Sequence, residues 1–191
     1  RGVSRAWGGP CGPAGRISVP GRGSGHASGS ARYNASLGFR GSVPELRIDS
    51  NLQVLAQNLP APLAKPAEAA WPLRLASAVQ GVQGDKAVSD RITLQLGPAA
   101  QPLVDLIAER DLRGESARLV RGSLAVGERA ALPPQGLHAQ LRVGELDLDA
   151  WRALLRDSGT DAVAVAGEGL PLAVSLRADA ALVDGRRFQR V

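Results

Sequence analysis

The chain has 191 residues, a formal net charge of +5, one cysteine and 3% aromatic residues. A single cysteine excludes an internal disulfide and a cysteine-based zinc cluster, and the scarcity of aromatic residues argues against the stacking platforms of single-strand nucleic-acid binders. The positive charge lies at one end, because six arginines precede the first acidic residue, Glu45, and the rest of the chain has a charge of −1. We therefore expect no nucleic-acid partner.

Residues 1–30 are a low-complexity segment rich in Gly, Arg and Pro, with almost no apolar periodicity. Such a composition buries too little apolar surface to offset the conformational entropy of the chain. Two interpretations remain open: a disordered linker, or a stretch that is not native because its coding DNA was read in the wrong frame. We assign the β-rich fold to residues 31–191. The absence of Met predicts that the chain is an internal fragment.

From residue 31 onward, short segments alternate apolar and polar residues between turn signals. A period of two places the apolar residues of each strand on one face. The first of these strands is expected to run on through Leu52 and Val54. The candidate apolar residues are, in chain order, Leu46, Ile48, Leu52, Leu73, Leu75, Ile92, Leu94, Leu96, Leu137, Leu141, Val143, Leu172, Val174 and Leu176.

Two further segments carry local signals. The apolar parity changes across Gly122, which indicates a β-bulge or the start of a new element. Residues 103–112 alternate but are also compatible with a helical turn. One short helix is predicted over 148–157, because Asp147 or Asp149 can cap its start and Gly159 can end it.

These elements predict an all-β, mainly antiparallel fold with roughly seven to nine strands and one short helix. Each strand has an apolar and a polar face. An apolar face usually forms the core of a sandwich or barrel, and less often lines a groove that holds lipid. Composition does not decide between the two.

The residues that carry chemistry in other proteins form no convincing site here. Asp147, Asp149, Asp157 and Asp161 cluster near the predicted helix, where helix capping and a solvated rim explain them. His138 lies at a polar position of its strand, and Cys11 lies in the low-complexity segment. A general base needs a nucleophile and an orienting partner, and the sequence nominates neither. We therefore predict no catalytic residue, no metal site and no cofactor.

Several separated blocks resemble one family in order and spacing. They are LRIDSNLQVLAQNLPAPLAKPAEAAWPLRL (46–75), DRITLQLG (90–97), ERDLRGESARLVRGSLAVGE (109–128), GLHAQLRVGELDLDAWRALL (136–155) and LRADAALVDGRRF (176–188). Together they resemble the AsmA-like YhdP family of Gram-negative envelope proteins. The resemblance covers residues 31–191. Val54 departs from the pattern, because a small residue such as Gly is expected there.

The resemblance implies an extended curved sheet, or trough, whose apolar inside holds phospholipid acyl chains. It also implies a periplasmic, non-enzymatic protein that is anchored in the inner membrane through a segment outside this chain. Its expected role is to move phospholipid between the inner and outer membranes and to support the outer-membrane barrier. The candidate floor of the trough is the apolar set given above. The alternative is a structural or assembly-assisting envelope module that binds proteins through its sheet edges.

Overall fold

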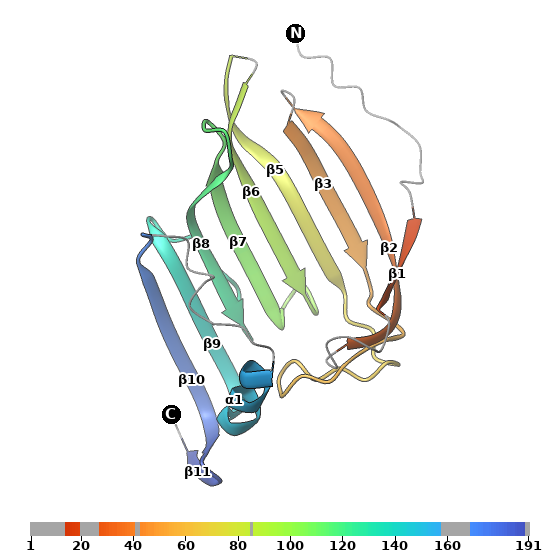
Figure 1. Ribbon diagram of the computed structural model, residues 1–191, viewed down its shortest axis with the longest axis vertical. Helices are drawn as coiled ribbons and strands as arrows, with labels where there is room; N and C mark the ends of the chain where they lie inside the picture. The colour runs from red at the N-terminus through yellow and green to blue at the C-terminus, as the bar shows by residue number, and fades with distance from the viewer. Residues whose placement is uncertain (1–13, 20–26, 41–42, 85, 158–168, 190–191) are drawn as a thin grey trace.

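The computed structural model describes residues 14–19, 27–40, 43–84, 86–157 and 169–189. They form one 11-stranded sheet and one helix (Figure 1). The helix α1 spans Leu148–Asp157. The strands are β1 (Ala14–Val19), β2 (Ala27–Arg40), β3 (Val43–Ser50), β4 (Leu55–Gln57), β5 (Leu73–Gln83), β6 (Lys86–Leu96), β7 (Val104–Asp111), β8 (Arg118–Val126), β9 (Gly136–Asp147), β10 (Leu172–Val183) and β11 (Arg186–Gln189).

The sheet follows the order β1-β2-β3-β5-β6-β7-β8-β9-β10-β11, and β4 pairs with β2. The prediction of an all-β, mainly antiparallel fold with one short helix is confirmed. The ambiguous segment 103–112 is a strand, β7. β1 and the start of β2 fall within residues 1–30. The division of the chain at residue 30 stays a prediction.

Two neighbouring pairs, β8–β9 and β9–β10, are parallel. A parallel pair needs a connection that returns the chain to the other end of the sheet. α1 lies in the connection from β9 to β10, and residues 127–135 connect β8 to β9. The helix begins where it was predicted, with the Asp147 carboxylate accepting a hydrogen bond from the backbone N–H of Ala150 at 2.8 Å. The predicted terminator Gly159 lies outside the described residues.

The predicted parity change near Gly122 is a β-bulge. Glu109 of β7 pairs with Arg121, but the next residue, Arg110, pairs with Leu119. Val120 therefore has no partner on β7, and the apolar positions that follow return to the face of Leu119.

The expected continuation of the first strand through Leu52 and Val54 is wrong, because β3 ends at Ser50. The Ser50 hydroxyl accepts the backbone N–H of Leu52 at 3.1 Å, and the Asn51 side chain accepts that of Gln53 at 3.1 Å. Such side-chain bonds to the backbone two residues later turn the chain. Leu52 and Val54 have φ values of 48° and 70°. A small residue would suit position 54, because positive φ strains a β-branched residue.

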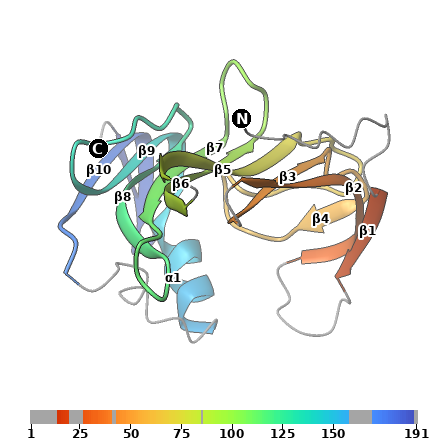
Figure 2. The same cartoon turned by 90° about the horizontal axis from the view of Figure 1, so that it is seen from above.

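The sheet is strongly curved and arches over α1 when seen from above (Figure 2). Few large side chains are buried in a hydrophobic core. The buried apolar residues are mostly alanines, and one cluster joins Val143, Leu146 and Ala178 to the half-buried Trp151 and Leu148. α1 is therefore attached to the sheet at the β9–β10 side, through its first turns.

Candidate functional site

The strand register brings the apolar residues together on the concave face of the sheet. Directly paired residues point to the same side of a sheet, so each row of partners shares a face. We call this surface the trough face. Three rows cross it from β2 to β10: Leu37, Leu46, Ser77, Ile92, Ala108, Gly122, Leu137 and Leu172; Ala35, Ile48, Leu75, Leu94, Leu106, Leu124, Ala139 and Val174; and Tyr33, Ser50, Leu73, Leu96, Val104, Val126, Leu141 and Leu176.

All the candidate residues except Leu52 occupy paired positions on this face; Val143 follows Leu141 on β9 with the same parity. Leu52 lies in the turn beyond β3, outside these rows. The rows also contain residues that sequence analysis missed as candidates, namely Leu37, Val104, Leu106, Leu124 and Val126. For the last four residues the bulge at Val120 and the ambiguity of residues 103–112 obscured the alternation, whereas Leu37 is placed on this face by its pairing with Leu46. Whether these residues contact lipid stays a prediction.

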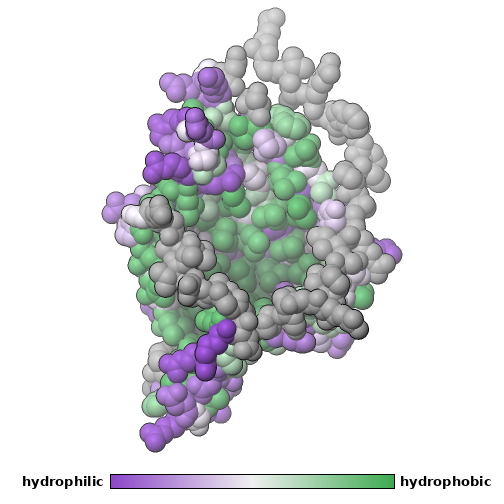
Figure 3. All heavy atoms as spheres, in the orientation of Figure 1, coloured by the Kyte–Doolittle hydropathy of each residue, from purple (hydrophilic) through white to green (hydrophobic). Residues whose placement is uncertain are grey.

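The trough face is open to solvent. Val174 is 63% exposed, Leu172 54% and Phe39 70%, and the leucines of the central strands are half-buried. Apolar side chains gather over the hollowed centre of the molecule (Figure 3). Among the described residues no second sheet covers this face, so the sheet is neither a closed barrel nor half of a sandwich.

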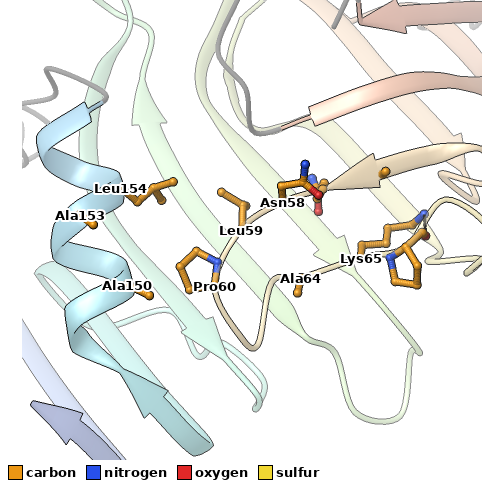
Figure 4. A pocket seen from close by; sticks show the side chains of 11 residues that line it. Asn58, Leu59, Pro60, Ala64, Lys65, Ala150, Ala153 and Leu154 are labelled. Carbon is orange, nitrogen blue, oxygen red and sulfur yellow. Dashed lines mark hydrogen bonds between the residues drawn. The ribbon is translucent and has the colours of Figure 1, made fainter. Parts of the chain in front are cut away.

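One end of the hollow is bridged by α1 and the segment that follows β4. The indole N–H of Trp151 donates a hydrogen bond to the backbone carbonyl of Ala61 at 3.1 Å. A cavity of about 740 Å³ lies between the two elements, where Leu154 and Ala150 of the helix face Leu59 and Pro60 (Figure 4). Its lining is largely apolar, so the apolar surface of the trough face continues into this cavity.

Lys65 lines the same cavity, but its ammonium is turned away from the helix (Figure 4). The residue is 2% exposed, and its Nζ donates to the carbonyls of Leu55 at 2.6 Å and Pro66 at 3.2 Å. Burial lowers the pKa of this ammonium below its usual range. Because Leu55 belongs to β4, these contacts show that Lys65 fastens the segment after β4 to that strand.

The trough face also carries an ion pair, at the end away from α1. Arg110 of β7 lies directly opposite Asp90 of β6. Its Nε and Nη2 donate to the two carboxylate oxygens at 3.0 and 2.5 Å, and the Ser77 hydroxyl donates to Oδ2 at 3.2 Å. The Asp90 side chain is 2% exposed and that of Arg110 is 33% exposed. The hydrogen bond to Asp90 raises the pKa of Arg110, against the opposing effect of burial.

The opposite, outer face carries the polar positions of the same strands. Glu109 accepts hydrogen bonds from Arg91 at 2.5 Å and from Arg121 at 2.8 Å, and these bonds, led by that from Arg91, hold its pKa below the usual range although burial opposes them. Residues 127–135 cross this face: the Ala130 N–H donates to Asp105, and Arg121 donates to the Pro133 carbonyl. The hydroxyl of Ser123 is buried on this face and has no hydrogen-bond partner among the described residues.

Two of the four acidic residues near the helix, Asp147 and Asp149, have structural roles. Asp149 accepts the backbone N–H groups of Asp184 and Gly185 at 2.9 Å each, and these bonds lower its pKa, that of Gly185 having the largest effect. They tie the β10–β11 hairpin to α1. Asp161 and Cys11 lie outside the described residues.

No group of three or more His, Cys, Asp or Glu residues suited to a metal ion occurs in the described part of the chain. His138 lies on the outer face, in the row of Ser123 and Ala173. None of the helices in the described ranges is long and apolar enough to cross a membrane. The described surface is a broad apolar floor with an ion pair at the end away from α1.

Comparison with protein-family models gives one finding: the model described as YhdP protein matches residues 19–191. No curated protein and no solved structure matches the chain. The match begins before β2 and extends past β11, so it includes every strand that contributes to the trough face.

Proposed function

The chain belongs to the YhdP family, and we propose that its trough face carries the acyl chains of phospholipids between the inner and outer membranes. The family is AsmA-like, is related to the bacterial envelope and is not known as an enzyme family. In this proposal the chain works in the periplasm and is anchored in the inner membrane through a segment outside it. It performs no catalysis, and it supports the outer-membrane barrier by supplying lipid.

The observation that carries the proposal is the exposed apolar face. Mainly apolar rows run from β2 to β10, and among the described residues α1 and the segment after β4 cover them only at one end. Each CH₂ group of an acyl chain that leaves water for such a surface gains about 0.8 kcal/mol. An unbroken floor therefore lets a chain slide between equivalent positions without a large free-energy step, while the headgroup remains hydrated.

Site-specific photocrosslinking tests this proposal. A photoreactive amino acid is placed at Leu94, on the trough face, or at the adjacent Gln95, on the outer face, and the chain is incubated with phospholipid vesicles. Both positions are half-buried, so they differ mainly in the face on which they lie. We expect lipid adducts at position 94 at least about tenfold above those at position 95, because an acyl chain bound on one face cannot contact the other. Equal labelling would contradict the proposal.

One observation favours a second function, in which the chain is a structural or assembly-assisting module that binds protein through its edges. β11 pairs with Ala180–Val183 of β10, and Leu172–Arg177 have no described partner on that side. An unpaired strand edge can accept another strand. This alternative predicts that the purified chain retains a polypeptide and no lipid, which mass spectrometry of the material that copurifies with the chain distinguishes.

A further inference from the structure

We propose that Arg110, positioned by Asp90, binds the phosphate group of a phospholipid whose acyl chain lies on the trough face. The inference rests on the proposed function and adds to it a binding site for the phosphate of the lipid headgroup. Within the paired segments of β5 to β8, Asp90 and Arg110 are the charged residues of the trough face; the other positions there are apolar or uncharged.

Stability alone does not account for this pair. Burying the Asp90 carboxylate and part of the Arg110 side chain carries a desolvation cost that an apolar pair at the same positions would not have. Replacing such ion pairs by apolar residues is often neutral or stabilising. The Asp90–Arg110 pair is not needed to fix the register of β6 and β7 either. Arg91 and Glu109 already form an ion pair in the next row of these two strands, on the outer face. A charged pair on an otherwise apolar floor therefore calls for a role on that floor.

The contacts of the pair prepare Arg110 for an anion. The Asp90 carboxylate is held by the guanidinium and by the Ser77 hydroxyl, so its orientation is fixed. Arg110 uses Nε and Nη2 for Asp90, and its Nη1 has no hydrogen-bond partner among the described residues. A guanidinium that is one-third exposed, oriented and left with free N–H groups matches the oxygens of a phosphate.

The distance from Arg110 to the bridged end suits a membrane lipid. Three apolar rows follow the ion pair along β6 and β7: Ile92 with Ala108, Leu94 with Leu106, and Leu96 with Val104. Six residues of a strand extend about 20 Å. The hydrocarbon of one leaflet is about 15 Å thick, half of a bilayer core. A phosphate at Arg110 therefore places the whole acyl chain on apolar floor, ahead of the helix.

A competition between two lipids with identical acyl chains tests the inference. The 191-residue chain is loaded from mixed detergent micelles that contain equal amounts of phosphatidylglycerol and diacylglycerol, and native mass spectrometry measures the ratio of the two retained lipids. We expect the wild type to favour phosphatidylglycerol about tenfold, the effect of one charge-assisted hydrogen bond.

The double variant Asp90→Asn/Arg110→Gln replaces the ion pair by two amides that can still bond to each other, so it avoids an unpaired buried charge. Its ratio should fall to about one. Asp90→Asn alone frees the positive charge of Arg110 and should raise the ratio above that of the wild type. The matched control is Arg91→Gln/Glu109→Gln, which removes the corresponding ion pair of the adjacent row on the outer face and should leave the ratio unchanged.

An unchanged ratio in Asp90→Asn/Arg110→Gln would overturn the inference, and so would an equal fall in the outer-face control, because that would indicate a general effect of charge. Retention of both lipids with no role for Arg110 would leave the proposed function intact. Failure of the wild type to retain either lipid would overturn the proposed function, and this inference with it.

Discussion

The two faces of the sheet are made by the same strands and differ in an unexpected way. The trough face is apolar but largely open, with Val174 63% exposed. The outer face is polar but partly covered, and beneath the crossing residues 127–135 it contains Ala125, at 0% exposure, and the buried Ser123. The most buried positions are therefore not the most apolar ones. In an ordinary globular domain the apolar face would be the covered one.

This difference indicates that packing on the apolar face is not the main interaction that stabilises the sheet. The large side chains remain accessible, and burial is concentrated in alanines, in the cluster around Val143 and Leu146, and under the connection from β8 to β9. Backbone pairing and the polar contacts of the outer face are left to maintain the curvature. An exposed apolar area of this extent is expected of a binding surface.

The largest expected effect comes from placing a charge in the middle of the apolar trough face. Leu94→Glu places a carboxylate in the middle of the trough face, and we expect the amount of retained phospholipid to fall at least about tenfold, because an acyl chain would have to cross a charge in an apolar surface. Mass spectrometry of copurified lipid measures it. The control Thr93→Glu, one residue away on the outer face, should retain wild-type amounts. Equal losses in both variants would show that the faces are not functionally distinct.

The next largest effect concerns residues 127–135, which cover part of the outer face. Gly127 begins the connection from β8 to β9 with a φ of 77°, and a Cβ there would overlap the backbone carbonyl oxygen of Arg142. Gly127→Ala should therefore lower the free energy of unfolding by about 3 kcal/mol or more, because both the strain and the overlap must be relieved. Urea-induced unfolding measures the difference.

Gly84→Ala is the matched control for this substitution. Gly84 also has positive φ, 61°, but a Cβ there would meet nothing within 4 Å. The cost should be about 1–2 kcal/mol, which is that of the left-handed conformation alone. Equal costs at the two positions would mean that the close approach of β9 to residue 127 is unimportant.

The smallest effect is a pH dependence that belongs to the outer face. Hydrogen bonds from Arg91 and Arg121 hold the pKa of Glu109 below its usual range. A depressed pKa in the folded state means that Glu109 stabilises the fold above its unfolded pKa of about 4.3, and that this contribution is lost as the pH falls through the folded value. The difference in unfolding free energy between the wild type and Glu109→Gln should thus be largest near neutral pH and shrink below about pH 4.

Asp111→Asn provides a comparison for the pH profile. The hydrogen bond from the Arg113 side chain lowers the pKa of Asp111 to about 2, so any difference from the wild type should persist to lower pH than at Glu109. Retention of lipid should not follow either profile, because both carboxylates lie on the outer face. A difference for Glu109→Gln that stays constant from pH 7 to pH 3 would contradict the assigned role of Arg91 and Arg121.

Much of the sheet was predictable because alternation is a local property. Ile48, Leu75 and Leu94 are far apart in the chain, yet their parity alone predicted a common face, and the register places them in one row. The α1 helix was equally local, since Asp147 caps it through a contact three residues away. Leu52 was misplaced because its turn depends on hydrogen bonds from Ser50 and Asn51, which alternation does not report.

Within each regular strand, the order of the residues determined which of them share a face, because successive side chains point to opposite sides. The rule was insufficient at Leu52 and at the bulge of Val120. The tertiary structure alone decided whether that face is a core or an open floor. The answer depends on curvature, on two parallel connections and on where α1 and residues 127–135 pack, all of which are contacts between distant parts of the chain. The pairing of Asp90 with Arg110 belongs to the same class, because only the alignment of β6 with β7 brings the two charges together on the trough face.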